Sequence, residues 1–140
     1  MSAHFSVEEL TFSSTAQRLE IDNTPPPDVL ANLQVLMAGL EEVRALLNCP
    51  LKIDSGYRSP TLNRYVNGAP DSDHIRGLAA DFICEIPPIE CVKRIAASDI
   101  KFSQVINEGS WCHVAFAPSL QRQVLTAHFT AGGTVYTEGV

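Results

Sequence analysis

Between residues 29 and 47, apolar residues recur three and four positions apart, which is the spacing of one face of an α-helix. These positions are Val29, Leu33, Leu36, Met37, Leu40, Val43 and Leu47. Thr24 and the prolines at 25–27 come just before, a capping residue followed by residues whose fixed φ suits a first helical turn. The pattern predicts one long amphipathic helix that ends near residues 48–50 and packs its apolar face on a core.

Shorter patterns predict the remaining elements. Ser6 and Glu9 form the pattern of a capping box, so a short helix carrying Leu10 is expected near the N-terminus. Residues 13–24 are predicted to be irregular, and residues 55–73, rich in Gly, Ser, Pro, Asn and Asp, to form a long loop with room for one helical turn. A helix is predicted over 88–97, and strands over 51–54, 78–84, 104–106, 113–116, from about 123, and through 135–136. The fold class is therefore α+β, with helices packed on one face of a small, mainly antiparallel sheet.

Length and composition narrow the possible classes of protein. The 140 residues fit a single domain, 1–140, and a chain of this size buries roughly two-thirds of its unfolded surface. The net charge of −6 argues against sequence-independent binding of nucleic acid, which requires Lys and Arg at the phosphates. No apolar run is long enough for a transmembrane helix, and the first residues lack a basic region followed by an apolar stretch. We therefore expect synthesis in the cytoplasm without a signal peptide, no membrane insertion, and a monomer.

The cysteines and two of the histidines are not expected to form functional sites. Cys49, Cys84, Cys91 and Cys112 include no Cys-x-x-Cys pair, which favours buried free thiols over disulfides and disfavours a thiolate metal site or a redox function. His4 and His128 are interpreted as surface or structural residues.

A metal site is suggested by His74, Asp81 and His113. A catalytic zinc ion needs three protein ligands from His, Asp or Glu and one open position for water. Strand alternation places Asp81 on the face opposite Phe82, and His113 on the face opposite Cys112. Structural roles are the alternative, since single histidines are often hydrogen-bonded core residues and a strand aspartate is often paired with an arginine or a backbone amide. The spacing alone leaves both interpretations open.

The residues around these three resemble a known family. The matching motifs are Ser55-Gly-Tyr-Arg-Ser-Pro60, Asn63, Val66-Asn-Gly68, Ser72-x-His74-x-x-Gly77-x-Ala79-x-Asp81 and Trp111-x-His113. From about residue 5 to 117 the chain resembles the M15 family of zinc D-Ala-D-Ala carboxypeptidases and related cell-wall endopeptidases, and most of all the small single-domain members of phages and prophages. The resemblance implies a fold shared with the Hedgehog signalling domain.

The resemblance also implies roles for individual residues. His74, Asp81 and His113 match the family's zinc ligands, and Glu108 is the candidate for the general base that precedes the final histidine. Some relatives carry an acidic residue nearer to that histidine, where this chain has Ser110, a poor base. The alternative for Glu108 is a solvated loop glutamate.

Three further residues have two interpretations each. Arg58 matches the arginine that binds substrate and stabilises the oxyanion, and its alternative is a structural salt bridge. Ser72 is expected to support substrate or loop, and its alternative is a turn-forming residue. Trp111 is expected either to line the cleft or to lie in the core, and Gly77 to adopt a backbone conformation closed to other residues.

The function implied is that of a zinc metallopeptidase, a hydrolase that cleaves peptide bonds in peptidoglycan stem peptides. It is expected to act as a D-Ala-D-Ala carboxypeptidase or as an L,D- or D,D-endopeptidase, degrading the cell wall in the manner of a phage endolysin. Its expected site of action is the periplasm or cell wall, after phage lysis or another release. The alternative is a non-catalytic, zinc-stabilised wall-binding or virion module of the same fold. The presence of both Glu108 and Arg58 favours the enzyme.

Overall fold

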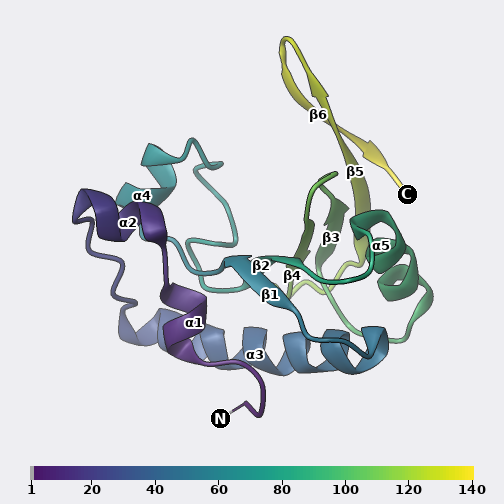
Figure 1. Ribbon diagram of the computed structural model, residues 1–140, viewed down its shortest axis with the longest axis horizontal. Coiled ribbons are helices and arrows are strands. Elements are labelled where there is room, and N and C mark those ends of the chain that lie inside the picture. The colour runs from purple at the N-terminus through teal and green to yellow at the C-terminus, as the bar shows by residue number, and fades with distance from the viewer. Residues whose placement is uncertain (1) are drawn as a thin grey trace.

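The computed structural model describes residues 2–140 and combines helices with one sheet, and the longest helix lies across one side of that sheet (Figure 1). The helices are α1 (Val7–Thr11), α2 (Ser14–Leu19), α3 (Pro27–Leu47), α4 (Pro60–Tyr65) and α5 (Pro88–Ala97). The strands are β1 (Lys52–Ser55), β2 (Ala79–Ile83), β3 (Gln104–Asn107), β4 (Cys112–Ala115), β5 (Gln123–Thr130) and β6 (Gly133–Glu138). The predicted α+β class is confirmed.

The strands form a six-stranded sheet in the order β1-β2-β4-β3-β5-β6. Every neighbouring pair is antiparallel except β3 and β5, which run parallel. The parallel pair arises because the chain leaves β4 and returns along residues 116–122 to the outer side of β3. The sheet is thus mainly antiparallel, as predicted, and its last two strands form a hairpin at one edge.

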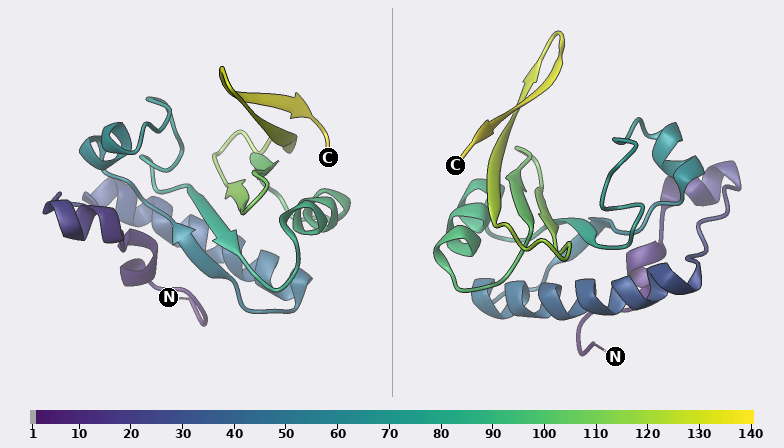
Figure 2. Two further views of the ribbon diagram at one scale, coloured as in Figure 1. Left: turned by 45° about the horizontal axis from the view of Figure 1, so that its top comes forward. Right: turned by 180° about the vertical axis from the view of Figure 1, so that it is seen from behind.

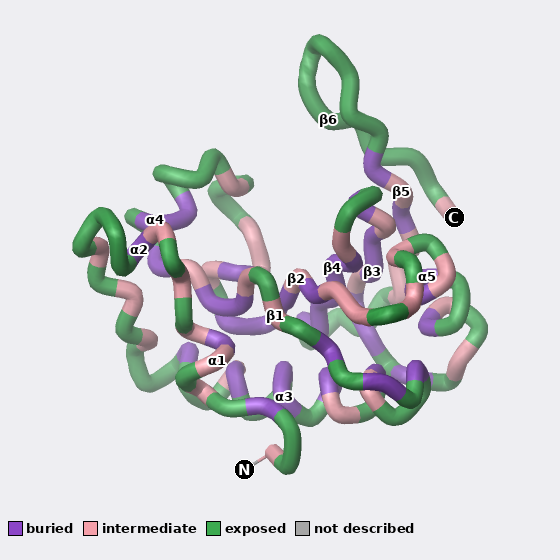
Figure 3. Tube along the Cα trace, viewed as in Figure 1, coloured by how far each residue is buried: buried purple, intermediate pink, exposed green. Residues whose placement is uncertain are grey.

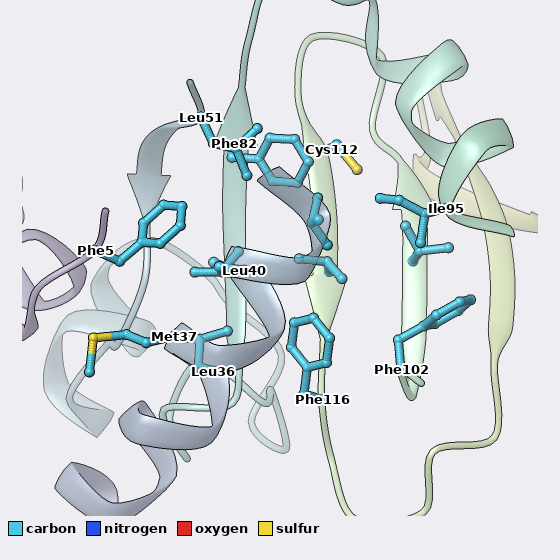
Figure 4. Packing of buried hydrophobic residues seen from close by; sticks show 14 of the residues in the cluster. Phe5, Leu36, Met37, Leu40, Leu51, Phe82, Ile95, Phe102, Cys112 and Phe116 are labelled. Carbon is cyan, nitrogen blue, oxygen red and sulfur yellow. The ribbon is translucent and has the colours of Figure 1, made fainter. Parts of the chain in front are cut away.

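One face of the sheet packs on the long helix α3 and on α5, and this contact forms the core (Figure 4). Leu36 and Leu40 of α3 belong to the same buried cluster as Phe82 of β2. Gly39 allows α3 to approach the Phe116 ring closely, since a Cβ atom at this position would clash with that ring. Because all of these side chains use one face of the sheet, the opposite face is free to carry polar groups.

Two details of the N-terminal region differ from the sequence prediction. Thr24 does not cap α3: the N-cap is Pro26, without a side-chain hydrogen bond, and the Thr24 amide donates to Oδ1 of Asp22 at 2.9 Å. Residues 13–24 are not irregular throughout, because α2 occupies Ser14–Leu19 and Ser13 accepts a hydrogen bond from the Ala16 amide at 3.1 Å. The expected cap at Ser6 is present, since its hydroxyl accepts from the Glu9 amide at 3.1 Å.

Two segments project from the sheet on the side away from α3 (Figures 1 and 2). One contains α4 and the loop that follows it, and the other is the hairpin of β5 and β6. Figure 3 shows that most of the projecting part of the hairpin is exposed. Within residues 2–140, none of the helices combines the length and the apolar character needed to cross a membrane.

The four cysteines are free, as predicted. Cys49, Cys91 and Cys112 are buried and Cys84 is half-buried. The sulfur atoms of Cys84 and Cys91 are 3.6 Å apart, well beyond the roughly 2.05 Å of a disulfide bond. Burial, together with a hydrogen bond to Cys84, raises the pKa of Cys91 to about 12, so this thiol stays protonated at neutral pH.

We predict that thiol titration of freshly purified protein, in denaturant and without reductant, counts four free thiols. The physical reason is that protonated, buried thiols react slowly with oxidants. A count of two would show instead that a disulfide forms in the native protein, and Cys84 and Cys91 would be the first pair to test.

Candidate metal centre and cleft

Two of the candidate ligands are brought together by strand register. Asp81 of β2 pairs directly with His113 of β4. Both side chains lie on the face opposite the core, because their neighbours Phe82 and Cys112 point into it. Oδ1 of Asp81 is 2.9 Å from Nδ1 of His113. The alternation predicted from the sequence is confirmed for both strands.

The third candidate, His74, comes from the turn that precedes β2. Its Nδ1 lies 2.7 Å from the carbonyl oxygen of Gly56, which can only accept a hydrogen bond, so Nδ1 carries the proton. Nε2 is therefore left with its lone pair and lies 3.3 Å from Oδ2 of Asp81. The Ser72 hydroxyl accepts from the His74 amide at 3.1 Å, and the Arg58 amide donates to the His74 carbonyl at 3.0 Å. These bonds hold the imidazole in place from the backbone side.

The three side chains fit a zinc ion by type, number and position. One potential ligand atom from each of His74, Asp81 and His113 lies within 4.8 Å of the other two. Among residues 2–140 this is the one group of three or more His, Cys, Asp or Glu side chains arranged in this way. Zinc sites used in catalysis hold the ion by three such ligands and leave one position for water. The Gly56 carbonyl is the kind of outer partner that fixes the tautomer of a metal-binding histidine.

Protonation at the site also suits a metal. Burial lowers the pKa of His74, against the opposing effect of Asp81, and this favours the neutral imidazole that binds metal. Burial acts to raise the pKa of Asp81, but the neighbouring His74 and His113 hold it well below its usual range. Asp81 is therefore a carboxylate at neutral pH.

The three side chains border an open cleft of about 650 Å³. Its lining includes all of the residues predicted for catalysis, metal binding and substrate binding, and Trp111 as well. These residues are Arg58, Ser72, His74, Asp81, Glu108, Trp111 and His113. His4 and His128 do not line it: both are exposed, and they hydrogen-bond to Glu41 and Thr137, respectively.

Glu108 lies at the end of β3 and is only 8% exposed, so it is not a solvated loop residue. Its amide donates to the Trp111 carbonyl at 3.1 Å and its carbonyl accepts from the Ser110 amide at 3.0 Å, which closes a tight turn. Burial raises the pKa of Glu108; His113 acts to lower it and Asp81 to raise it. A carboxylate with a raised pKa is a better base, as a proton carrier requires.

Arg58 forms no ion pair with any residue in the range 2–140. The alternative role for Arg58, a structural salt bridge, is therefore not seen among these residues. Its Nε atom is buried without a hydrogen-bond partner. Burial lowers the pKa of Arg58 and the nearby Asp81 acts to raise it. A buried donor without a partner is costly unless a ligand supplies the acceptor.

Two predicted supporting residues have clear local roles. The Ser72 hydroxyl supports the loop through its bond to the His74 amide, while its side chain also borders the cleft. Gly77 has φ +73°, and a Cβ there would lie 2.8 Å from Cγ1 of Val29. The expectation that this glycine adopts a conformation closed to other residues is confirmed.

Trp111 is half-buried and lines the cleft, and it is not one of the buried core residues.

One wall of the cleft was not predicted from the sequence. It is formed by residues of the β5–β6 hairpin, namely Leu125, Phe129, Thr134 and Tyr136. Strands were expected in this region, but no motif connects them with the metal ligands. Their position follows from the parallel pairing of β5 with β3, which the local sequence does not encode.

Comparison with known proteins agrees with this geometry. The sequence model of the family described as Peptidase M15 matches residues 3–115, a range that includes the three candidate ligands, Arg58, Ser72 and Glu108 and leaves out the β5–β6 hairpin. A search of curated proteins gives no match. Since the matched residues make up most of the chain, the protein belongs to the M15 family of peptidases.

Proposed function

We propose that this protein is a zinc-dependent peptidase that hydrolyses peptide bonds in the stem peptides of bacterial peptidoglycan. The observation that carries the proposal is the convergence of His74, Asp81 and His113 at a cleft that Glu108 and Arg58 also line. A non-catalytic metal site needs the three ligands alone. A buried carboxylate and a buried guanidinium donor without a partner, both facing the same cleft, favour catalysis.

His74, Asp81 and His113 would hold the zinc ion. When bound in such a site, zinc lowers the pKa of a water molecule to about 7 and polarises the carbonyl group to be cleaved. His74 contributes Nε2, because its Nδ1 proton is engaged by Gly56. The hydrogen bonds around His74 keep its ring from rotating away from Asp81.

Glu108 is the proposed general base and acid. Its carboxylate accepts a proton from the water as the water oxygen adds to the carbonyl carbon of the substrate. It then gives this proton to the amine nitrogen as the carbon–nitrogen bond breaks, so that a carboxylic acid and an amine are released. The pKa raised by burial helps both transfers, since the carboxylate binds the proton more firmly than an exposed one.

Arg58 is proposed to bind the substrate through the carbonyl oxygen that becomes negative during the reaction. A guanidinium stays charged and offers several N–H donors in one plane, which suits an oxyanion. The Nε atom of Arg58 supports this role, because it is a buried hydrogen-bond donor without an acceptor, and a substrate oxygen could supply one. Ser72 is proposed to support both the substrate and the position of His74.

The proposed substrate class follows from the motifs shared with cell-wall peptidases, which act on stem peptides that contain D-amino acids. The proposed site of action is the periplasm or cell wall, reached after phage lysis or another release, as for an endolysin. We propose that the protein acts as a monomer.

The experiment that tests the proposal is digestion of purified peptidoglycan with zinc-loaded protein, with and without a chelator, followed by mass analysis of the soluble products. We expect peptide fragments from the zinc-loaded protein, none in the chelator, and recovery on adding zinc back. Binding to the wall without any released peptide would contradict the proposal and support a non-catalytic wall-binding module.

A further inference from the structure

The hairpin of β5 and β6 continues the metal-binding face of the sheet. Asp81 pairs with His113, His113 with Ile106, and Ile106 with Leu125, so one row of side chains crosses β2, β4, β3 and β5 on a single face. Ile106 and Leu125 belong to a small apolar cluster separate from the main core. The hairpin is thus fixed to the active face through packed residues.

Two aromatic rings on the hairpin face the cleft. Phe129 of β5 and Tyr136 of β6 both line it, although their side chains are 61% and 48% exposed. Val135, the neighbour of Tyr136 in β6, is 53% exposed but does not line the cleft. Exposed aromatic rings bordering a binding cleft are suited to contact a ligand, because they offer a large rigid surface at little cost in entropy.

These rings border the same cleft as Glu108, and Phe129 lies close to the residue that follows it. The Cε2 atom of Phe129 is 3.5 Å from the position that a Cβ would take on Gly109, the residue after Glu108. Tyr136 pairs with Ala127, which lies two residues before Phe129 in β5, and it lines the same cleft as Glu108. Since the proposed proton transfer from Glu108 ends on the amine that leaves, the hairpin borders the space of the leaving group.

Arg58 lies on the other side of the metal ligands. It follows β1, whereas Glu108 follows β3, and the strand order places β2 with Asp81 and β4 with His113 between them. A guanidinium at this position can reach the carbonyl group of the bond being cleaved. It can also reach the part of the substrate that stays attached to that carbonyl group after cleavage. It is on the wrong side to bind a group carried by the leaving amine.

Among residues 2–140, no lysine or arginine lines the leaving-group side of the cleft, where a free carboxylate would need one. Among the described residues that line the cleft, Arg58 is the one lysine or arginine. Residues 123–138 contain neither. Arg122, just before the hairpin, is engaged elsewhere: its guanidinium donates to the carbonyls of Ala96 and Ser98, at 3.0 and 3.1 Å, and stacks on the Phe102 ring. A carboxypeptidase releases an amino acid whose carboxylate needs such a partner.

We infer that the enzyme is an endopeptidase, whose β5–β6 hairpin binds the leaving-group side of an internal peptide bond through Phe129 and Tyr136. The inference rests on the proposed function. It narrows the substrate from either a terminal or an internal peptide bond to an internal one. The substrate extends past the cleaved bond along the aromatic wall. Phe129 and Tyr136 are therefore specificity-determining residues that act on substrate binding rather than on the metal.

The experiment compares two substrates, cross-linked peptidoglycan and a free stem pentapeptide ending in D-Ala-D-Ala. The parent protein is expected to release multi-residue peptides from peptidoglycan and to release single D-alanine at least about tenfold more slowly, the cost of leaving a charged group without a partner. Release mainly of D-alanine from either substrate would overturn the inference while leaving the peptidase function standing. A parent protein that cleaves neither substrate would overturn the proposed function, and this inference with it.

The second arm uses Phe129→Ala, Tyr136→Ala and Tyr136→Phe, with Val135→Ala as the matched control on the same hairpin. We expect each alanine change at the aromatic wall to lower kcat/KM on peptidoglycan-derived peptides by roughly 10- to 100-fold. This factor corresponds to the free energy gained by burying one large apolar side chain. The change should appear mainly as a higher KM, because the two rings bind substrate and do not take part in the chemical step. Zinc content and the circular dichroism spectrum should match the parent. Values for Phe129→Ala and Tyr136→Ala equal to that of Val135→Ala would contradict the role of the wall.

Discussion

Replacing His74, Asp81 or His113 with alanine is expected to abolish both zinc binding and peptidase activity. Each side chain is proposed to supply one of three ligands, and a site reduced to two loses the geometry that holds zinc tightly. The parent is expected to bind about one zinc per chain. Asp81 has a second effect, because its carboxylate lies 2.9 Å from His113 and 3.3 Å from His74, so removing it leaves two imidazoles without their shared partner.

The measurement is elemental analysis of dialysed, zinc-loaded protein, alongside hydrolysis of peptidoglycan. His128→Ala is the matched control, since His128 is an exposed histidine that bonds to Thr137 and does not line the cleft. The control should bind zinc as the parent does. Zinc content near one per chain in all three ligand variants would show that the metal site lies elsewhere.

Replacing Glu108 with glutamine is expected to lower turnover by roughly 10²- to 10⁴-fold, the usual contribution of general acid–base catalysis, while zinc content stays normal. Glutamine keeps the size of the side chain and the backbone bonds of the turn, but it cannot carry the proton. The side chain is not among the atoms that form the candidate metal site, so the zinc content should not change.

Single-turnover kinetics and zinc content, measured on the same preparation, separate loss of the base from loss of the metal. Glu42→Gln, on the exposed surface of α3, is the matched control for removing one carboxylate. Full activity in Glu108→Gln would refute the base assignment and leave the zinc site standing. Asp71 and Asp73, which also line the cleft, would then be tested as proton carriers.

The sequence predicted the parts of this protein that depend on local pattern. The apolar spacing defined α3 because a buried helix face must recur every three or four residues, and strand alternation placed Asp81 and His113 on the face away from the core. Arg58, Ser72 and Glu108, which were assigned roles through the resemblance to the M15 family, line one cleft.

What could not be predicted depends on contacts between distant segments. Helix α2 was missed because it is short and only Ala16 of it is buried, so it has almost no apolar stripe to detect. The position of the β5–β6 hairpin beside the cleft was not predicted, because it depends on the parallel pairing of β5 with β3. This pairing is determined by the route that residues 116–122 take between β4 and β5. The burial of Glu108 and the Gly56 carbonyl behind His74 are likewise products of tertiary packing.

The alternation of β2 also protects the fold against mispairing. Shifting this strand by one residue would turn Phe82, which is fully buried, toward the open cleft and force the carboxylate of Asp81 onto α3. An unpaired carboxylate inside an apolar core is far costlier than the loss of any single packing contact. The residue proposed to hold the metal thus also disfavours the neighbouring register while the chain folds, so the same carboxylate serves the proposed site and the accuracy of strand pairing.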